Sequence, residues 1–192
     1  MANIDSAFGF RPIKRLDGAA WTGNHTTRKM LTNATALNRG DLVQALPSGY
    51  VQAMTGAVTD HSPVGVFVGC HYLASSLGYP IWSNYWPGAG ATGEVDAFII
   101  DDPLVVFEVQ AAAGPITFAD IGMTANPTVV ASTTGFSKWS LATPASLATA
   151  AFRVVALGDG APSVGNGYDH TTAYNIVQVA WNDQIYKQMV AV

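Results

Sequence analysis

Hydrophobic and polar positions alternate along this chain in short runs, and residues typical of turns separate the runs. Over residues 104–110, for example, Val105, Phe107 and Val109 fall on one face of an extended chain and the residues between them fall on the other. Residues 174–181 show the same period of two. This alternation predicts short β-strands.

The predicted strands follow one another at short intervals. Residues 42–46 and 50–54 form a predicted hairpin whose loop contains Pro and Gly. Gly65 and Gly69 disfavour a helix in the next apolar run by about 1 kcal/mol each relative to Ala. Frequent short strands with hardly any helical period predict a mainly β chain folded as a compact β-barrel or β-sandwich. The other predicted strands cover residues 64–72, 95–100, 104–110, 152–157 and 174–181, and residues 79–93 form an aromatic loop or edge region.

Residues 1–33 lack a sustained period and are interpreted as an extended N-terminal arm, ahead of a β-rich domain over residues 34–192. The first 39 residues contain six Lys or Arg and two Asp, a net charge of +4, and because the whole chain carries −4 the remainder carries −8. This asymmetry predicts that the arm lies on an acidic surface, such as that of a neighbouring copy; the alternative is a solvated terminus. The predicted partner-binding residues of the arm are Phe8, Phe10, Arg11, Lys14, Arg15 and Trp21.

Charged residues make up 11% of the chain, less than half of the roughly 25% found in an average soluble domain. The surface must therefore consist largely of small polar, small apolar and aromatic residues, which suits contact with other proteins. No apolar run is long enough to cross a membrane, and the first residues do not resemble a signal peptide, so we expect assembly in a cytoplasm and no membrane contact. Cys70 is the only cysteine and is expected to be a small buried hydrophobe.

The candidate chemistry is sparse. Cys70 and His71 are adjacent, and adjacent side chains on a strand point to opposite faces, so they are not expected to form a catalytic dyad. With Asp60 and His61 they make the nearest approach to a metal site, but the spacing matches no zinc pattern. The cations of the arm are too dispersed for a phosphate-binding patch. The sequence therefore predicts a protein that is not an enzyme, holds no cofactor or metal and binds no nucleic acid directly.

An acidic pair and a group of aromatic residues each allow several interpretations. Asp101 and Asp102 fit a solvated turn, a site for a hard cation, or acceptors for an arginine of a partner. Trp82, Tyr85 and Trp86 fit a cap on the chain's own core, anchors in an interface with a partner, or a platform on which sugars stack.

The opening FGFRPIKRLDGAAWTGN resembles the start of small structural proteins encoded in the head-gene region of tailed bacteriophages. The segments RGDLVQ, PVGVFVGC, IIDDPLVVFEVQA and NIVQVAWNDQIYK are similar to further elements of these proteins. The chain thus resembles the head decoration or cement proteins, although its long N-terminal arm departs from the strictly globular members.

This resemblance implies a small β-barrel or β-tulip that binds the outside of a capsid and stabilises it by bridging neighbouring subunits. The implied partners are the major capsid protein and further copies of this chain, in a homo-oligomer such as a trimer. The implied location is the capsid surface of the virion, after assembly in the host cytoplasm. Two other classes stay open: a carbohydrate-binding or tail-adhesion module that uses exposed aromatics, and a small enzyme with a pocket around His61, His71 or the acidic residues.

Overall fold

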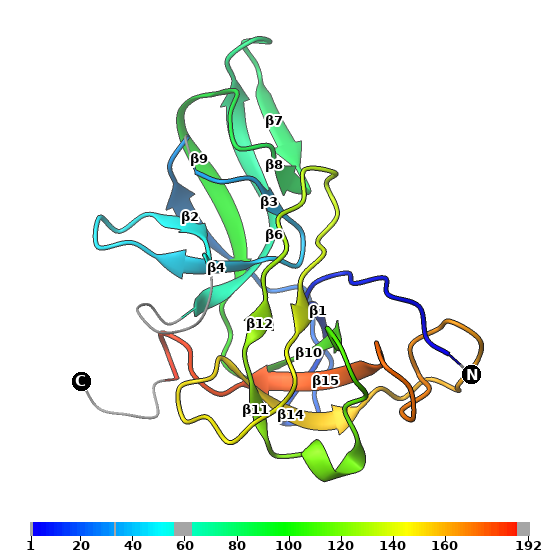
Figure 1. Ribbon diagram of the computed structural model, residues 1–192. Coiled ribbons are helices and arrows are strands. Elements are labelled where there is room, and N and C mark those ends of the chain that lie inside the picture. Colours follow the sequence, from blue (N-terminus) through cyan, green and yellow to red (C-terminus); the bar gives the residue numbers. More distant parts are fainter. Residues whose placement is uncertain (1, 33, 56–62, 188–192) are drawn as a thin grey trace.

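The computed structural model describes residues 2–32, 34–55 and 63–187, and it confirms the prediction of a mainly β chain that contains a β-barrel (Figure 1). Strands account for 45% of the residues and helix for 2%. Its elements are β1 (Arg11–Arg15), β2 (Thr26–Met30), β3 (Leu37–Asn38), β4 (Leu42–Ala45), β5 (Val51–Ala53), β6 (Pro63–Ala74), β7 (Pro80–Ser83), β8 (Tyr85–Trp86), β9 (Ala91–Ile100), β10 (Val105–Gln110), the 3-10 turn η1 (Phe118–Asp120), β11 (Thr124–Ala125), β12 (Pro127–Thr128), β13 (Ser140–Leu141), β14 (Phe152–Leu157) and β15 (Ile176–Trp181).

Five strands close into a barrel in the upper half of Figure 1. They follow the order β4-β5-β2-β9-β6, and a further pairing of β4 with β6 completes the ring. Neighbouring strands are antiparallel except β2 and β5, which meet in parallel at Met30 and Val51. Strand β7 pairs with the outer part of β6 and forms an edge of this sheet.

The barrel is filled by one face of each strand, as the alternation along the sequence requires. On β9, Ile99 is buried in the barrel core, whereas Ile100 points the other way into a second core below. Strands β4 and β6 divide their side chains between the two cores in the same manner. The backbones pack tightly at Gly65, where an added Cβ would lie 2.3 Å from the carbonyl oxygen of Ile100. The two halves of the molecule therefore share continuous packing.

The lower half is a five-stranded sheet in the order β1-β10-β15-β14-β11, with every pair antiparallel. Its inner face carries a stack of aromatic rings. Phe152 lies between Phe10 and Trp181, with centroid distances of 4.4 and 4.6 Å, and Phe107 meets Trp181 edge to face at 5.5 Å. The small sheet β12-β13 contributes Leu141 to the same core.

The predicted strands are present, but their partners differ from the simplest expectation. The hairpin of residues 42–46 and 50–54 is confirmed as the antiparallel pair β4-β5. Strands β9 and β10 do not form a hairpin across Asp101 and Asp102, because β9 belongs to the barrel and β10 to the lower sheet. Residues 79–93 contain β7, β8 and the start of β9.

The segment interpreted as an arm contributes a strand to each half. Strand β1 pairs with β10 in the lower sheet, and β2 pairs with β9 in the barrel. The stretch between them, residues 16–25, contains no further strand. The N-terminal segment therefore connects the two sheets of its own chain (Figure 1).

Candidate functional site

A hairpin formed by the end of β6 and by β7, residues 73–82, projects beyond the closed barrel (Figure 1). We call it the apical hairpin. Its turn is tight, because the amide of Ala74 donates to the carbonyl of Tyr79, and the amide of Gly78 donates to that of Ala74. Gly78 has a φ of 70°, a conformation that glycine adopts without the steric cost of a Cβ.

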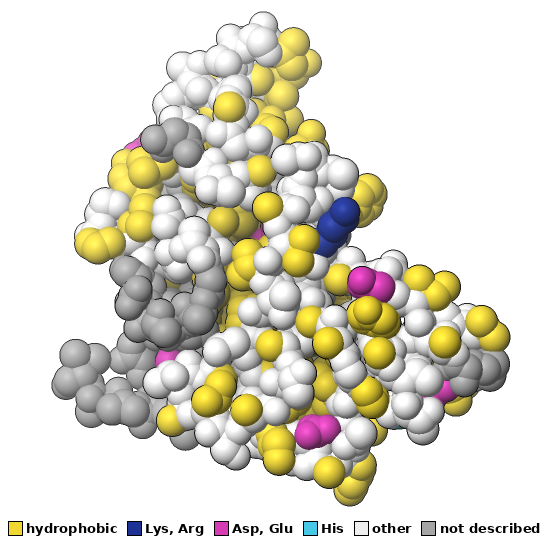
Figure 2. Space-filling view, viewed as in Figure 1, with side chains coloured by type: hydrophobic (Ala, Val, Ile, Leu, Met, Phe, Trp, Pro, Cys, Tyr) yellow, Lys and Arg dark blue, Asp and Glu magenta, His cyan; other side chains and the backbone are white. Residues whose placement is uncertain are grey.

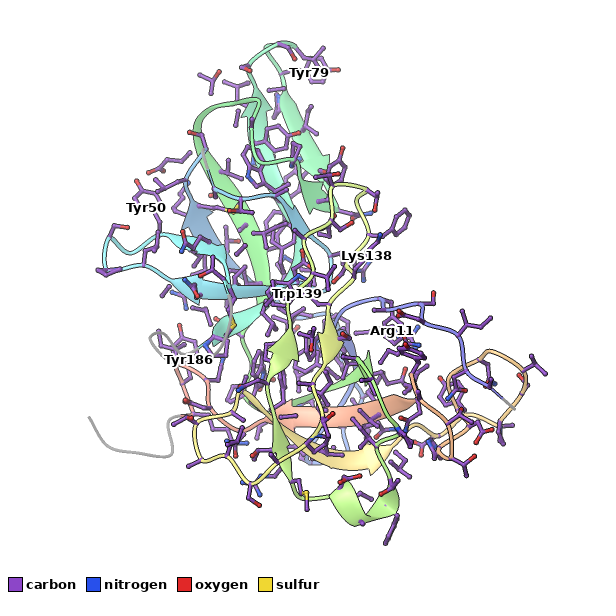
Figure 3. All side chains as sticks on the ribbon, viewed as in Figure 1. Arg11, Tyr50, Tyr79, Lys138, Trp139 and Tyr186 are labelled. Atoms are coloured by element: carbon purple, nitrogen blue, oxygen red, sulfur yellow. The ribbon has the colours of Figure 1, made fainter. Side chains whose placement is uncertain are left out.

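The apical hairpin exposes large hydrophobic side chains within a segment of the sequence that contains no charged residue. The exposed fractions of Leu77, Tyr79 and Trp82 are 53%, 54% and 71%, and Leu73 is exposed as well. Residues 72–93 contain no Asp, Glu, Lys or Arg. Figure 2 shows hydrophobic side chains and no charged ones at this end of the molecule, and Figure 3 shows Tyr79 at its tip. The end of the barrel thus presents an apolar, uncharged surface to solvent.

A row of aromatic rings crosses the outer face of the barrel next to the apical hairpin. The ring of Trp82 stacks on Phe98 with a centroid distance of 5.3 Å and an interplanar angle of 8°. His71 contacts Trp82 at 4.5 Å, and His25 meets Phe98 edge to face at 5.1 Å. Strands β7, β6 and β9 bring Trp82, His71 and Phe98 together, so the exposed indole of Trp82 packs against two rings of its own chain.

Charged residues continue this outer face beyond the aromatic row. Lys29 Nζ lies 2.7 Å from Asp96 and 3.4 Å from Glu94. Asp96 also lies 3.7 Å from His71 Nδ1, and the hydroxyl of Tyr50 donates to Glu94 at 2.8 Å. The hydrogen bond from Lys29 holds the pKa of Asp96 below its usual value, and the same bond raises the pKa of Lys29. The face therefore combines an exposed ring with ionised hydrogen-bonding groups.

The three predicted aromatic contact residues do not form one platform. Trp86 is fully buried in the barrel core, where its indole N–H donates to the carbonyl of Ala34 at 3.2 Å and its ring packs edge to face on Tyr72. Tyr85 is partly exposed and Trp82 largely so. This corrects the prediction of Trp86 as a partner-binding residue and agrees with the alternative in which it covers the chain's own core: Tyr85 and Trp86 are adjacent in β8 and point to opposite faces.

Phe10 also belongs to the core. Its ring is buried and stacks on Phe152, and its amide donates to the carbonyl of Gly40 at 2.9 Å. The interpretation of Phe10 as an anchor for a partner is corrected accordingly, since the side chain is covered by its own chain. Phe8 remains partly exposed, with the Arg11 guanidinium 5.0 Å from its ring centroid.

The cations of the N-terminal segment meet carboxylates of the same chain. Arg11 Nη2 lies 2.5 Å from Glu108, and Arg15 Nη1 lies 2.7 Å from Asp102. Each pair joins β1, or its end, to the region of β10. The acidic residues that Arg11 and Arg15 contact therefore belong to the same chain and not to a neighbouring copy.

The remaining predicted residues have different surroundings. Arg28 lies 3.3 Å from Asp101, so both carboxylates of the 101–102 turn accept from arginines of this chain. Lys14 forms no ion pair with any residue that the structure describes. Trp21 is partly buried against the lower core.

Cys70 and His71 lie on opposite faces of β6, as their adjacency predicts. Cys70 is buried in the barrel, its thiol donates to the carbonyl of Tyr85 at 3.4 Å, and burial raises its pKa to about 12. Asp60 and His61 lie outside the described residues. Within the described ranges, no group of three or more His, Cys, Asp or Glu could hold a metal ion.

The sequence analysis did not single out the exposed side chains of Leu77 and Tyr79, although the uncharged stretch of residues 72–93 could have indicated them. Comparisons of the chain with protein-family models, curated proteins and solved structures find no match. Among the residues that the structure describes, no helix is long and apolar enough to span a membrane.

Proposed function

We propose that this chain is a structural virion protein that binds the outside of a phage capsid and stabilises it by bridging neighbouring capsid subunits. The observation that carries the proposal is the apical hairpin, a projecting surface that exposes Leu73, Leu77, Tyr79 and Trp82 without any charged residue nearby in the sequence. The resemblance of several sequence segments to phage head proteins is the reason for proposing a phage capsid as the partner. The proposal assigns the chain no catalytic activity.

Leaving this apolar surface in water costs free energy that a partner would recover by covering it. Fully burying a large hydrophobic side chain stabilises a complex by about 1.5–3 kcal/mol. Contiguous exposed apolar surface on a soluble chain typically marks a site of protein contact. The low charge of the hairpin suits the centre of an interface, where charged residues are depleted.

In this proposal the N-terminal segment does not bind a neighbouring subunit; it supports the apical hairpin from within its own chain. Strands β1 and β2 join the lower sheet and the barrel, so they fix the base from which the apical hairpin projects. A rigid base lowers the entropy lost when the hairpin binds. Repetition over a shell, with further copies of this chain as additional partners, would multiply weak contacts into a large gain in particle stability.

The test compares two double variants on undecorated capsids of a tailed phage. Leu77→Ser with Tyr79→Ser removes hydrophobic contacts from the apical hairpin, and Phe118→Ser with Val164→Ser removes hydrophobic side chains elsewhere that are even more exposed, at 80% and 76%. We expect the hairpin variant to lose occupancy and heat protection, while the control variant retains both. Equal binding by the hairpin variant, or failure of the unmodified chain to bind or protect the capsids, would contradict the proposal.

A second candidate, a carbohydrate-binding or tail-adhesion module, is favoured by the exposure of Trp82 and its packing on neighbouring rings. An exposed indole stacked on Phe98, with His71 and Asp96 beside it, combines an apolar ring face with hydrogen-bonding groups. Binding to a glycan array that is lost in Trp82→Ala and kept in the double variant Leu77→Ser/Tyr79→Ser would select this function over capsid binding.

A further inference from the structure

A cleft lies at the junction of the barrel, the loop after β12 and the segment that leads into β1. Its volume is about 690 Å³, within the range of about 300–1,000 Å³ that ligand sites occupy. Residues that are distant in the sequence form its walls: Ser6, Phe8, Arg11, Arg39, Val68, Asn84 and Phe136 are among them. None of them belongs to the apical hairpin.

Two pairs of an arginine and a phenylalanine line this cleft. Arg11 holds its guanidinium over the ring of Phe8 at 5.0 Å. Arg39 and Phe136 are partners in an isolated parallel β-bridge, so their side chains project from adjacent backbone on the same face. The cleft therefore offers positive charge next to aromatic surface twice.

The charge of the cleft opposes that of the whole molecule. The chain carries a net charge of −4, yet the lining contains two arginines and neither Asp nor Glu. Glu108 occupies one side of Arg11, but Arg39 has no ion-pair partner among the residues that the structure describes. Beside the lining, the exposed sequence neighbours of Ser6 and Ser137 are Asp5 and Lys138, whose charges are opposite, so the net charge of the cleft comes from its arginines. The cleft is thus complementary to a carboxylate.

The exposure of Phe136 indicates the size of the ligand. Its exposed fraction is 77%, although it lines the cleft. A small molecule held within a pocket would leave most of this ring uncovered, whereas a polypeptide that runs through the cleft and past its rim would cover it. A nucleic acid fits less well, because its successive phosphates would meet few cations and an acidic body.

From these observations we infer that the cleft binds an acidic peptide segment of a partner protein, in which a carboxylate lies beside an apolar or aromatic side chain. The carboxylate accepts hydrogen bonds from Arg39, and the neighbouring side chain packs on Phe136. Asn84 and Ser6 supply neutral groups for the peptide backbone. The inference goes beyond the proposed function and does not depend on it, since it concerns a separate surface.

The probe is a fluorescein-labelled peptide in which Asp and Phe alternate, and the readout is fluorescence polarisation with the full chain at low and high salt. We expect Arg39→Gln to weaken binding about tenfold, the effect of losing one hydrogen bond to a charged group. Phe136→Ser should weaken it by a comparable factor. Replacing Asp by Asn in the peptide, or raising the salt concentration, should also weaken binding.

Matched variants outside the cleft make the result specific. Lys14→Gln removes a cation that has no ion-pair partner in the described part of the chain, and Phe118→Ser removes a ring whose exposed fraction is 80%. Both should bind the peptide as the unmodified chain does, and so should the apical-hairpin variant. The inference is overturned if the unmodified chain does not bind the peptide, if Arg39→Gln binds it normally, if the control variants lose binding equally, or if a single-stranded oligonucleotide binds more tightly.

Discussion

The barrel and the lower sheet cover their two faces differently. The lower sheet packs an aromatic stack on its inner face, and its outer face is covered by its own chain. There, Gln110 donates to the carbonyls of Ile4 and Tyr174 at 2.8 and 3.0 Å, and Gln178 donates to Asp159 at 2.8 Å. Both glutamines are buried.

The barrel buries only its interior and the side that meets the lower sheet. Its outer face carries the exposed ring of Trp82, with the partly buried Phe98 and His71 beside it. The outer face of the lower sheet is thus largely covered within the chain, apart from the cleft beside β1, whereas the barrel leaves the surface around Trp82 uncovered. This difference is why the contact surface in the proposed function lies on the barrel.

The largest expected effect comes from breaking the aromatic stack of the lower sheet. Phe152→Ala should lower the free energy of unfolding by about 3–5 kcal/mol, because it leaves a cavity and removes ring partners on both sides. Phe67→Ala in the barrel should cost less, since no ring pair in the described residues involves Phe67. Urea unfolding of both variants measures the difference, and an equal or larger loss for Phe67→Ala would contradict it.

An intermediate effect is expected where the two halves meet. Gly65→Ala should destabilise the chain by about 1–3 kcal/mol, because the new Cβ would clash with the backbone at Ile100 and force the strands apart. Gly114→Ala is the control, since its Cβ would enter open space. Thermal unfolding should shift for the first variant only; a similar shift in both would show that the close approach of β6 and β9 is not the cause.

A smaller effect concerns the charged outer face of the barrel. The folded-state pKa of Asp96 lies below its usual value, so its pairing with Lys29 stabilises the fold above the unfolded pKa, near 3.8, and this contribution is lost as the pH falls. Asp96→Asn should therefore narrow the stability difference between neutral and acidic pH. Because both side chains are partly exposed, the change should be smaller than either core effect and should disappear at high salt.

The smallest expected signal is the alkylation of Cys70 in the folded chain. With a pKa of about 12 the thiol is protonated at neutral pH and is also shielded by the barrel, so alkylation by iodoacetamide should be negligible in the folded chain. In rising urea, reaction should begin only where the barrel opens. If the thiol reacts before the backbone amides of β15 in the lower sheet exchange with deuterium, the barrel opens independently; simultaneous changes would show that the two halves unfold together.

Much of the secondary structure could be predicted because the strands are amphipathic. The alternation at Val105, Phe107 and Val109 matches their burial in the lower core, and the final strand behaves in the same way. Strands β3, β8, β11, β12 and β13 were not predicted, because strands of two residues have no measurable period. Strands β1 and β2 were not predicted either, because they lie in the segment interpreted as an arm. The turn residues Asp101 and Asp102 indicated a change of direction but not that the chain passes from one sheet to another.

The candidate site was predictable only in part. The aromatic segment was identified, but its tryptophans differ in burial. Trp82 is exposed and Trp86 is buried because β7 pairs with β6 whereas β8 pairs with β3. The sequence predicted that the basic N-terminal segment contacts an acidic surface. Only the fold shows that Arg11 lies beside Glu108 and Arg15 beside Asp102.

The sequence by itself determined that the chain is mainly β, which positions alternate, and that its surface is poor in charge, because the period of two and the turn residues are local properties. The tertiary structure decided that β4 pairs with β6 to close the barrel, that Phe10 and Trp86 are buried, and that the apical hairpin stays exposed. The reason is that strands pair through backbone groups that nearly every residue carries. Pairing partners far apart in the chain are therefore chosen by the packing of the whole core.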